Sequence, residues 1–274
     1  MTRANDLYKV NKTHSIAECI DGTDLIVMAV KPQNSDLVCS EIYSAMSDKN
    51  CNRLDPTILS IIAGRTIGSF VDGCGGLVTK IVRSMPNTPS QIGSGISVWT
   101  CTPNINMKEK QKIKKILSSF GKEIFVEDES FVDMSTSISG SGPAYIFLLM
   151  ESMIDAGVHL GFSRDVATTL VHHTLLGSTL YAMETKEHPA ILRNSVTSPA
   201  GTTASALYEL ENGKFSTVVK NAVWACYRRS LEMGGNCSGV GPGRRKTPSN
   251  ENFGLNVNLP SGECVDEDSD DERK

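Results

Sequence analysis

The pattern of apolar residues changes once along the chain, shortly after residue 128. Between residues 23 and 128, short β-branched runs alternate with loops and helical stretches, which is typical of a mostly parallel sheet with helices between its strands. From about residue 137 to 234, apolar residues recur at helical spacing only. The expected strands are 25–30, 57–64, 77–87, 96–101 and 123–128, with helices at 32–48 and 106–121. The sequence therefore predicts an α/β domain followed by an all-α domain.

The helical region begins with the most apolar segment of the chain. Pro143 is expected near the first helical position, and Ser163 is expected to cap the next helix. Further helices are expected after "SPAGTT" and at 216–233. The first helix is apolar on nearly all sides from Ala144 to Met150, and such a helix must be buried all round. Because so few helices can hardly bury it alone, we expect a second subunit to cover it.

The last part of the chain has a different composition. Residues 235–274 are rich in Gly, Pro, Ser, Asn and acids, and are expected to form a disordered tail. The predicted domains are therefore 1–136, 137–234 and 235–274. The final twelve residues, "ECVDEDSDDERK", hold seven acids and two bases, so the rest of the chain carries a formal charge of about +1. A nearly neutral body indicates no nucleic-acid partner.

The eight cysteines are scattered, and none of them forms a C-x-x-C pair. This spacing predicts neither a metal site nor a disulfide framework, and it favours reduced thiols, mostly packed as small core residues. No run reaches the ~18 apolar residues that would span a membrane, and the first residues do not resemble a signal peptide. We therefore expect a cytoplasmic protein, and a targeting segment ahead of Met1 stays open.

Three loops follow successive expected strands and turn at Pro or Gly: "AVKPQ" (29–33), "IIAG" (61–64) and "MPNTP" (85–89). The carboxyl ends of parallel strands meet at one edge of a sheet, where α/β folds bind ligands. Any one of these loops could be an ordinary β–α turn. All three together favour a crevice, lined by backbone and small side chains, that suits a flat cofactor ring.

The segment "TSPAGTTASALYELENG" (197–213) begins with a tight turn at Pro199 and Gly201, after which Thr202 and Thr203 open a helix. The first backbone amides of a helix have no internal partner, so with the two hydroxyls they could bind a carboxylate. The simpler alternative is a helix capped by Ser or Thr, and the segment alone favours that alternative slightly. "SISGSGPAYIF" (137–147) has a similar composition and is either a close-approach site or a flexible linker.

Taken together, these segments resemble the pyrroline-5-carboxylate reductase family. The resemblance covers roughly Asp21 to Met233 and rests on motifs that stand in the family's order: "AVKPQ", "AGRTI", "VRSMPNTP", "SGSGPAYIF" and "VTSPAGTTASALYELENGKF". It implies a Rossmann-type dinucleotide-binding domain and a helical domain that joins two subunits, often within a larger ring. It also implies reduction of pyrroline-5-carboxylate to L-proline with NADPH or NADH.

The resemblance also implies roles for individual residues. Ser198, Gly201 and Thr202 match the family's substrate loop, in which Thr203 would hydrogen-bond the imine nitrogen and is the catalytic candidate. Ala63 matches a residue near the nicotinamide, and Asn87 matches the loop that closes that side. The strand-end residues that would contact the cofactor are Ala29, Val30, Lys31 and Pro32.

The sequence departs from the family's pattern in three places. The family begins with a strand and a G-x-G-x-x-G loop, and no such motif stands before Thr23. The resemblance therefore implies an incomplete sheet that lacks about one and a half β–α units. Ala200 stands where the family usually has a second Gly, which predicts strain if its φ is positive. Ile16 stands where a cofactor-contacting Asn is common.

These departures leave two hypotheses open. The first is a reductase whose sequence here begins downstream of the glycine loop. The second is a non-catalytic paralogue that pairs with a full-length reductase. The intact substrate loop favours the first hypothesis, because a degenerate chain would be free to lose that loop as well.

Overall fold

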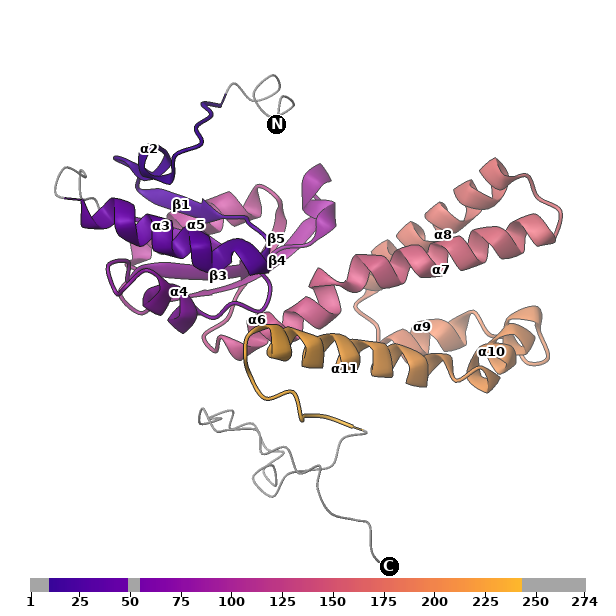
Figure 1. The fold of residues 1–274 in the computed structure, drawn as a ribbon. Coiled ribbons are helices and arrows are strands. Elements are labelled where there is room, and N and C mark those ends of the chain that lie inside the picture. The colour runs from indigo at the N-terminus through magenta and orange to yellow at the C-terminus, as the bar shows by residue number, and fades with distance from the viewer. Residues whose placement is uncertain (1–9, 49–54, 243–274) are drawn as a thin grey trace, which may run out of the picture. The chain divides into compact units, whose positions relative to one another are not determined.

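The computed structural model describes residues 10–48 and 55–242 (Figure 1). They form two compact units, one with the residues up to Gly140 and from Cys226 onward, the other spanning Ser141–Ala225. The first unit contains two separate stretches of the chain. The last turns of the final helix, from Cys226 onward, therefore group with the sheet. The predicted tail lies outside the described residues from 243 onward.

The first unit is built on a five-stranded sheet in the order β1-β2-β3-β4-β5. β1, β2 and β3 run parallel, β4 is antiparallel to β3, and β5 is parallel to β4. The predicted, mostly parallel sheet is thus confirmed, and four of its five strands are shorter than expected, whereas β4 is one residue longer. β1 forms one edge of the described sheet, and Val27 on it is 54% exposed. The strands are β1 (Leu25–Met28), β2 (Thr57–Ser60), β3 (Ile81–Met85), β4 (Gly95–Cys101) and β5 (Gly121–Phe125).

Helices cover both faces of this sheet. Neighbouring residues of a strand point to opposite faces, so each strand contributes side chains to two cores. Ile58 and Ile81 join the core beneath α3 and α4, which includes Phe70. The adjacent Leu59 and Val82 join the core beneath α5. The helical elements of this part are α2 (Ile16–Ile20), η1 (Pro32–Asn34), α3 (Ser35–Ser47), α4 (Ile67–Gly73), η2 (Thr88–Ile92), α5 (Met107–Ser118), α6 (Ser130–Ser135) and the π-helical turn η3 (Thr136–Gly140).

The second unit is helical throughout, and α7 and α8 pack side by side (Figure 1). Ser163 caps α8 as predicted, since its side chain accepts a hydrogen bond of 3.3 Å from the amide of Val166. In the predicted close-approach or linker segment, residues up to Gly140 belong to η3, and α7 begins at Gly142. The helices are α7 (Gly142–His159), α8 (Arg164–Thr185), α9 (Pro189–Ser195), α10 (Thr202–Asn212) and α11 (Phe215–Met233), the last of which ends in the first unit.

Two further expectations can be compared with the described residues. No helix among them is long and apolar enough to cross a membrane. Of the six cysteines described, Cys39 and Cys74 are buried, whereas Cys19 and Cys237 are exposed. Cys101 is partly buried against the second core and Cys226 is half-buried, so three of these six cysteines lie in or against a core.

Candidate functional site

Three loops that carry the candidate cofactor residues lie at one edge of the sheet. β1, β2 and β3 are parallel neighbours, and the register pairs Met28 with Ser60 and Ser60 with Arg83. The loops after these strands therefore leave the sheet on the same side, as the sequence predicts. They carry Ala29, Val30, Lys31 and Pro32 after β1, Ala63 after β2 and Asn87 after β3.

The loop after β2 is shaped by close contact with the end of α11. Ala63 is half-buried and is followed by Gly64, whose φ is +75°. A Cβ at Gly64 would lie 2.8 Å from the Cβ of Met233, and a Cβ at Gly234 would lie 2.4 Å from the carbonyl oxygen of Gly64. Two glycines thus allow this loop and the helix end to pack backbone against backbone.

The side chain of Asn87 stabilises the loop after β3 through a hydrogen bond. It precedes η2, and its side-chain oxygen accepts a hydrogen bond of 3.0 Å from the amide of Ile96 at the start of β4. This bond closes the loop between β3 and β4. The side chain therefore sets the loop's shape whether or not it also contacts a cofactor.

Arg65 joins the loop after β2 to the segment that follows β1. Its guanidinium donates a hydrogen bond of 2.8 Å to the hydroxyl of Ser35, pairs with Asp36, and donates one of 3.0 Å to the carbonyl of Ser69. The guanidinium carbon also lies 5.0 Å from the centre of the Phe70 ring, a cation–π distance. Arg65 thus links the start of α3 to the start of α4, the helices that follow two of the three candidate loops.

A buried ion pair lies behind the third loop. Arg83 on β3 is 1% exposed and binds Asp133 through two nitrogens, at 2.7 and 3.0 Å. It also donates a bond of 2.8 Å to Glu129. Burial lowers the pKa of Arg83, but hydrogen bonds and attraction to Asp133 and Glu129 outweigh it, so the pKa is raised overall. Arg83 therefore stays charged, with both acids as counter-ions.

The candidate substrate residues gather at the start of α10, in the second unit. Gly201 is the N-cap residue, and no side chain of the described residues caps the helix there. The alternative that a Ser or Thr side chain caps α10 is therefore wrong. The first amides of α10 have no partner within the helix, and Thr202 and Thr203 are its first two residues, a combination that suits a carboxylate.

The turn before α10 is held by Ser198 and strained at Ala200. The amide of Gly201 donates a bond of 3.0 Å to the carbonyl of Ser198. A Cβ at Gly201 would lie 2.5 Å from the Ser198 hydroxyl and 3.1 Å from its carbonyl oxygen, so a larger residue there would have to displace Ser198. Ala200 has a φ of +56°, which confirms the predicted condition for strain, because L-residues with a Cβ disfavour the left-handed region.

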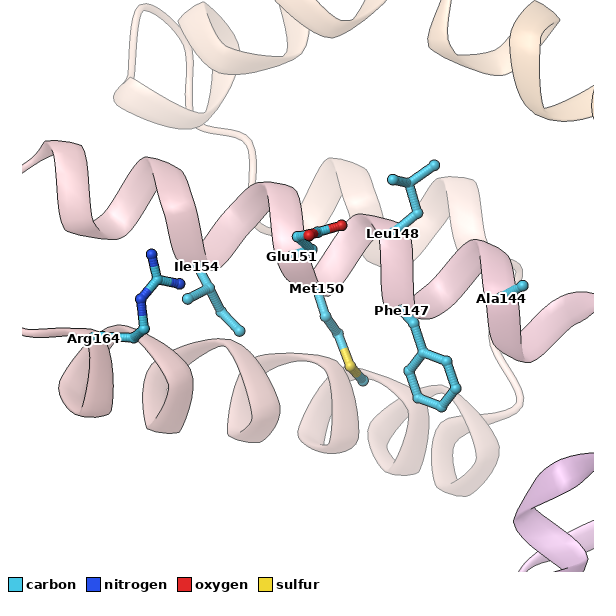
Figure 2. A pocket seen from close by; sticks show the side chains of 7 residues that line it. All are labelled: Ala144, Phe147, Leu148, Met150, Glu151, Ile154 and Arg164. Carbon is cyan, nitrogen blue, oxygen red and sulfur yellow. The ribbon is translucent and has the colours of Figure 1, made fainter.

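A separate groove of about 610 Å³ runs along α7 and contains none of the candidate site residues. Figure 2 shows Leu148 and Glu151 on one side of α7 and Phe147 and Met150 on the other. Phe147 is 58% exposed and Leu148 64% exposed, so apolar side chains face solvent on both sides of this helix in a single chain. The remaining lining residues are Ala144, Ile154 and Arg164.

Sequence reasoning missed the charged residues behind the loops. An arginine inside an apolar strand, as in "IVRSM", is itself a signal, because a buried guanidinium requires acidic partners. Glu129 and Asp133 stand four positions apart on and before α6, the spacing that places two side chains on one helix face. Among residues 10–48 and 55–242, no three His, Cys, Asp or Glu side chains are placed to hold a metal ion.

Comparison with known proteins gives a consistent result. A profile described as "Pyrroline-5-carboxylate reductase dimerisation" matches residues 129–233. The pyrroline-5-carboxylate reductase of Pseudomonas aeruginosa is 35% identical over 82% of this chain and 80% of its own length. That of Arabidopsis thaliana is 34% identical over 82% of this chain and 79% of its own length.

Solved structures agree with these relatives. Pyrroline carboxylate reductase from Plasmodium falciparum, crystallised with NADP bound, matches with a TM-score of 0.76 and 36% identity over 82% of each chain. The pyrroline-5-carboxylate reductase of Coxiella burnetii matches with a TM-score of 0.70 and 32% identity, covering 82% of this chain and 81% of its own. The chain belongs to the pyrroline-5-carboxylate reductase family.

Proposed function

We propose that this protein reduces 1-pyrroline-5-carboxylate to L-proline with NADPH or NADH, the last step of proline biosynthesis. The observation that carries the proposal is the start of α10. A helix N-terminus without a side-chain cap, two threonines and a strained turn stand where the family's substrate loop falls. Such a helix end binds a carboxylate, and the substrate carries one.

The cofactor is expected at the edge formed by the loops after β1, β2 and β3. These loops present small side chains and backbone, which fits a flat nicotinamide ring. Ala29, Val30, Lys31 and Pro32 would contact the cofactor at the end of β1. Ala63 would lie near the nicotinamide, and Asn87 would belong to the loop that closes that side. When bound, the nicotinamide supplies the hydride that the imine carbon accepts.

The proposed role of the residues in this chain is to position the substrate. Hydride transfer to the imine carbon needs no side chain that adds a proton to carbon or removes one from it. The amides at the start of α10, together with Ser198, Gly201 and Thr202, would hold the carboxylate. The hydroxyl of Thr203 would hydrogen-bond the ring nitrogen and orient the protonated imine. Because a protonated imine is already electrophilic, orientation and charge placement account for most of the expected rate enhancement.

Homodimerisation is part of the proposal. The region 129–233 that matches the dimerisation profile includes α7, whose apolar side chains face solvent on both sides in a single chain. A second copy of the helical unit would bury these side chains. The favourable free energy would come from removing apolar surface from water. We further propose that the protein acts in the cytoplasm.

The test of the substrate site compares pyrroline-5-carboxylate with 1-pyrroline, which lacks the carboxylate. If the start of α10 binds that group, kcat/KM should fall at least ~100-fold for 1-pyrroline, because the amides of the helix end lose their charged acceptor. Thr203→Val should lower kcat/KM for pyrroline-5-carboxylate by roughly 10- to 100-fold and leave NADPH affinity unchanged. Thr185→Val, at a half-buried position of α8 where the hydroxyl bonds the carbonyl of Tyr181, is the matched control. Equal kcat/KM for the two substrates would refute the assignment of the carboxylate site.

A further inference from the structure

The buried ion cluster behind the cofactor loops extends to a third element of the first unit. Asp133, 4% exposed on α6, accepts a hydrogen bond of 2.9 Å from the hydroxyl of Ser230 on α11. Ser230 is also 4% exposed. The carboxylate of Asp133 therefore receives two bonds from Arg83 and one from Ser230, and it connects β3 to the end of α11.

The same cluster reaches the loop after β2 by two routes. Glu129, the second acid on Arg83, accepts a hydrogen bond of 2.8 Å from the amide of Ile67, the first residue of α4. The turn of α11 that carries Ser230 packs against Gly64, whose Cβ position would lie 3.2 Å from the Ser230 carbonyl oxygen. The buried pair of Arg83 and Asp133, with the half-buried Glu129, thus joins the loop that carries Ala63 to the strand that leads into Asn87.

We infer that Arg83, Glu129, Asp133 and Ser230 form a positioning cluster that fixes the two loops carrying Ala63 and Asn87 in the shape that binds the nicotinamide cofactor. None of the four is placed in contact with cofactor or substrate, so each acts through the loops. The inference rests on the proposed function for the identity of the cofactor, but the rigidity of the loops can be measured without it.

Burial is the reason why this cluster can fix a backbone where a surface ion pair could not. Exposed ion pairs are screened by water and contribute little to stability. A buried guanidinium that loses one acidic partner, in contrast, keeps an uncompensated charge, which is strongly destabilising. The fork of Arg83 binds Asp133 with two nitrogens, which sets direction as well as distance. The two segments can therefore shift only if the whole cluster rearranges.

The test measures amide hydrogen exchange in the full chain without ligand. Ser230→Ala removes one bond to Asp133, and Arg83→Lys keeps the charge but loses the fork. In both variants we expect exchange at 63–67 and 85–87, including the Ile67 amide, to accelerate roughly tenfold, the ratio expected for a lost bond to a charged acceptor. Ser119→Ala is the control, since its exposed hydroxyl bonds only the carbonyl of Ile116 among the described residues.

Affinity for NADPH, measured by fluorescence titration, is the second readout. We expect the dissociation constant to rise roughly fivefold or more in Ser230→Ala and to stay unchanged in Ser119→Ala. The KM for pyrroline-5-carboxylate should stay within about twofold, because none of the four residues belongs to the segment at the start of α10 that is proposed to bind the substrate.

Each outcome decides the inference. Unchanged exchange at the two loops, or equal acceleration at β5, would overturn it, because the cluster would then be only a general stabiliser. If Arg83→Lys does not fold, Ser230→Ala decides alone. If the unchanged chain binds no NADPH, the proposed function fails, while exchange at the loops still supports or overturns the cluster's role.

Discussion

Gly64→Ala tests the contact between the cofactor loop and the end of α11. The added Cβ would lie 2.8 Å from the Cβ of Met233 and 3.2 Å from the carbonyl oxygen of Ser230. The residue would also have to keep a φ of +75°. Gly76→Ala is the matched control, because Gly76 has a φ of +73° but nothing within 4 Å of its Cβ position.

The two variants separate backbone strain from steric contact. Holding alanine in the left-handed region costs about 1–2 kcal/mol, partly offset by ~0.4–1 kcal/mol from the less flexible unfolded chain. Gly76→Ala should therefore lower the free energy of unfolding by about 1 kcal/mol. Gly64→Ala should add an overpacking cost of ~1–3 kcal/mol, for a total of roughly 2–4 kcal/mol.

Urea unfolding at neutral pH, with the free energy extrapolated to zero denaturant, measures both variants. NADPH affinity should fall for Gly64→Ala and stay unchanged for Gly76→Ala, since only Gly64 adjoins Ala63. If the two variants lose the same free energy of unfolding, the close packing of the loop on α11 is refuted.

Three further predictions concern other parts of the molecule. Ala200→Gly should raise the free energy of unfolding by up to ~1 kcal/mol in urea titrations, because it relieves a φ of +56°; a loss would contradict the strain. The pKa of Glu109 is lowered from its usual value of 4.5, first by a hydrogen bond from the Asn106 amide and then by Lys80. The ionised carboxylate therefore stabilises the folded protein above that pH, and this contribution is lost as the pH falls through the lowered pKa. Glu109→Gln should therefore have a lower Tm than the unchanged protein near pH 7, and the gap should close below about pH 4; a constant gap would refute the cause. Leu148→Glu should shift the protein to monomer in light scattering with unchanged helical circular dichroism, and an intact dimer would argue against α7 as the interface.

The sheet could be predicted because most of its strands are short runs rich in apolar and β-branched residues, as buried parallel strands require. β5 is the exception, since Lys122 and Glu123 interrupt it and most of its residues are exposed. Short helices were harder to predict. α4 and α9 each have seven residues, too few for a clear periodic pattern, so tertiary packing decides them.

The sequence was enough to locate the loops of the candidate site, but not to predict the buried contacts that hold these loops in place. Pro and Gly after each strand marked the three loops, and a parallel sheet necessarily places them at one edge. Arg83 finds its acids 46 and 50 positions further along, and Asp133 meets Ser230 97 positions further still. Contacts over such separations depend on the finished packing, and no local pattern in one sequence specifies them.

The start of α10 illustrates the same limit on a smaller scale. The sequence indicated a helix after "SPAGTT", and the helix begins at Thr202. Which residue caps it depends on backbone angles, and those angles place Gly201 at the cap with Ala200 in the left-handed region. The choice between a capped helix and an open anion site therefore needed the structure.

The most direct measurement is turnover by the purified chain of 274 residues, supplied with pyrroline-5-carboxylate and NADPH at neutral pH. Oxidation of NADPH is followed by absorbance, and proline is identified by mass spectrometry. We expect one proline formed for each NADPH oxidised, with the rate lowered by Thr203→Val and not by Thr185→Val. A folded protein that forms no proline, or that forms it equally well after Thr203→Val, would contradict the proposed function and its assigned site.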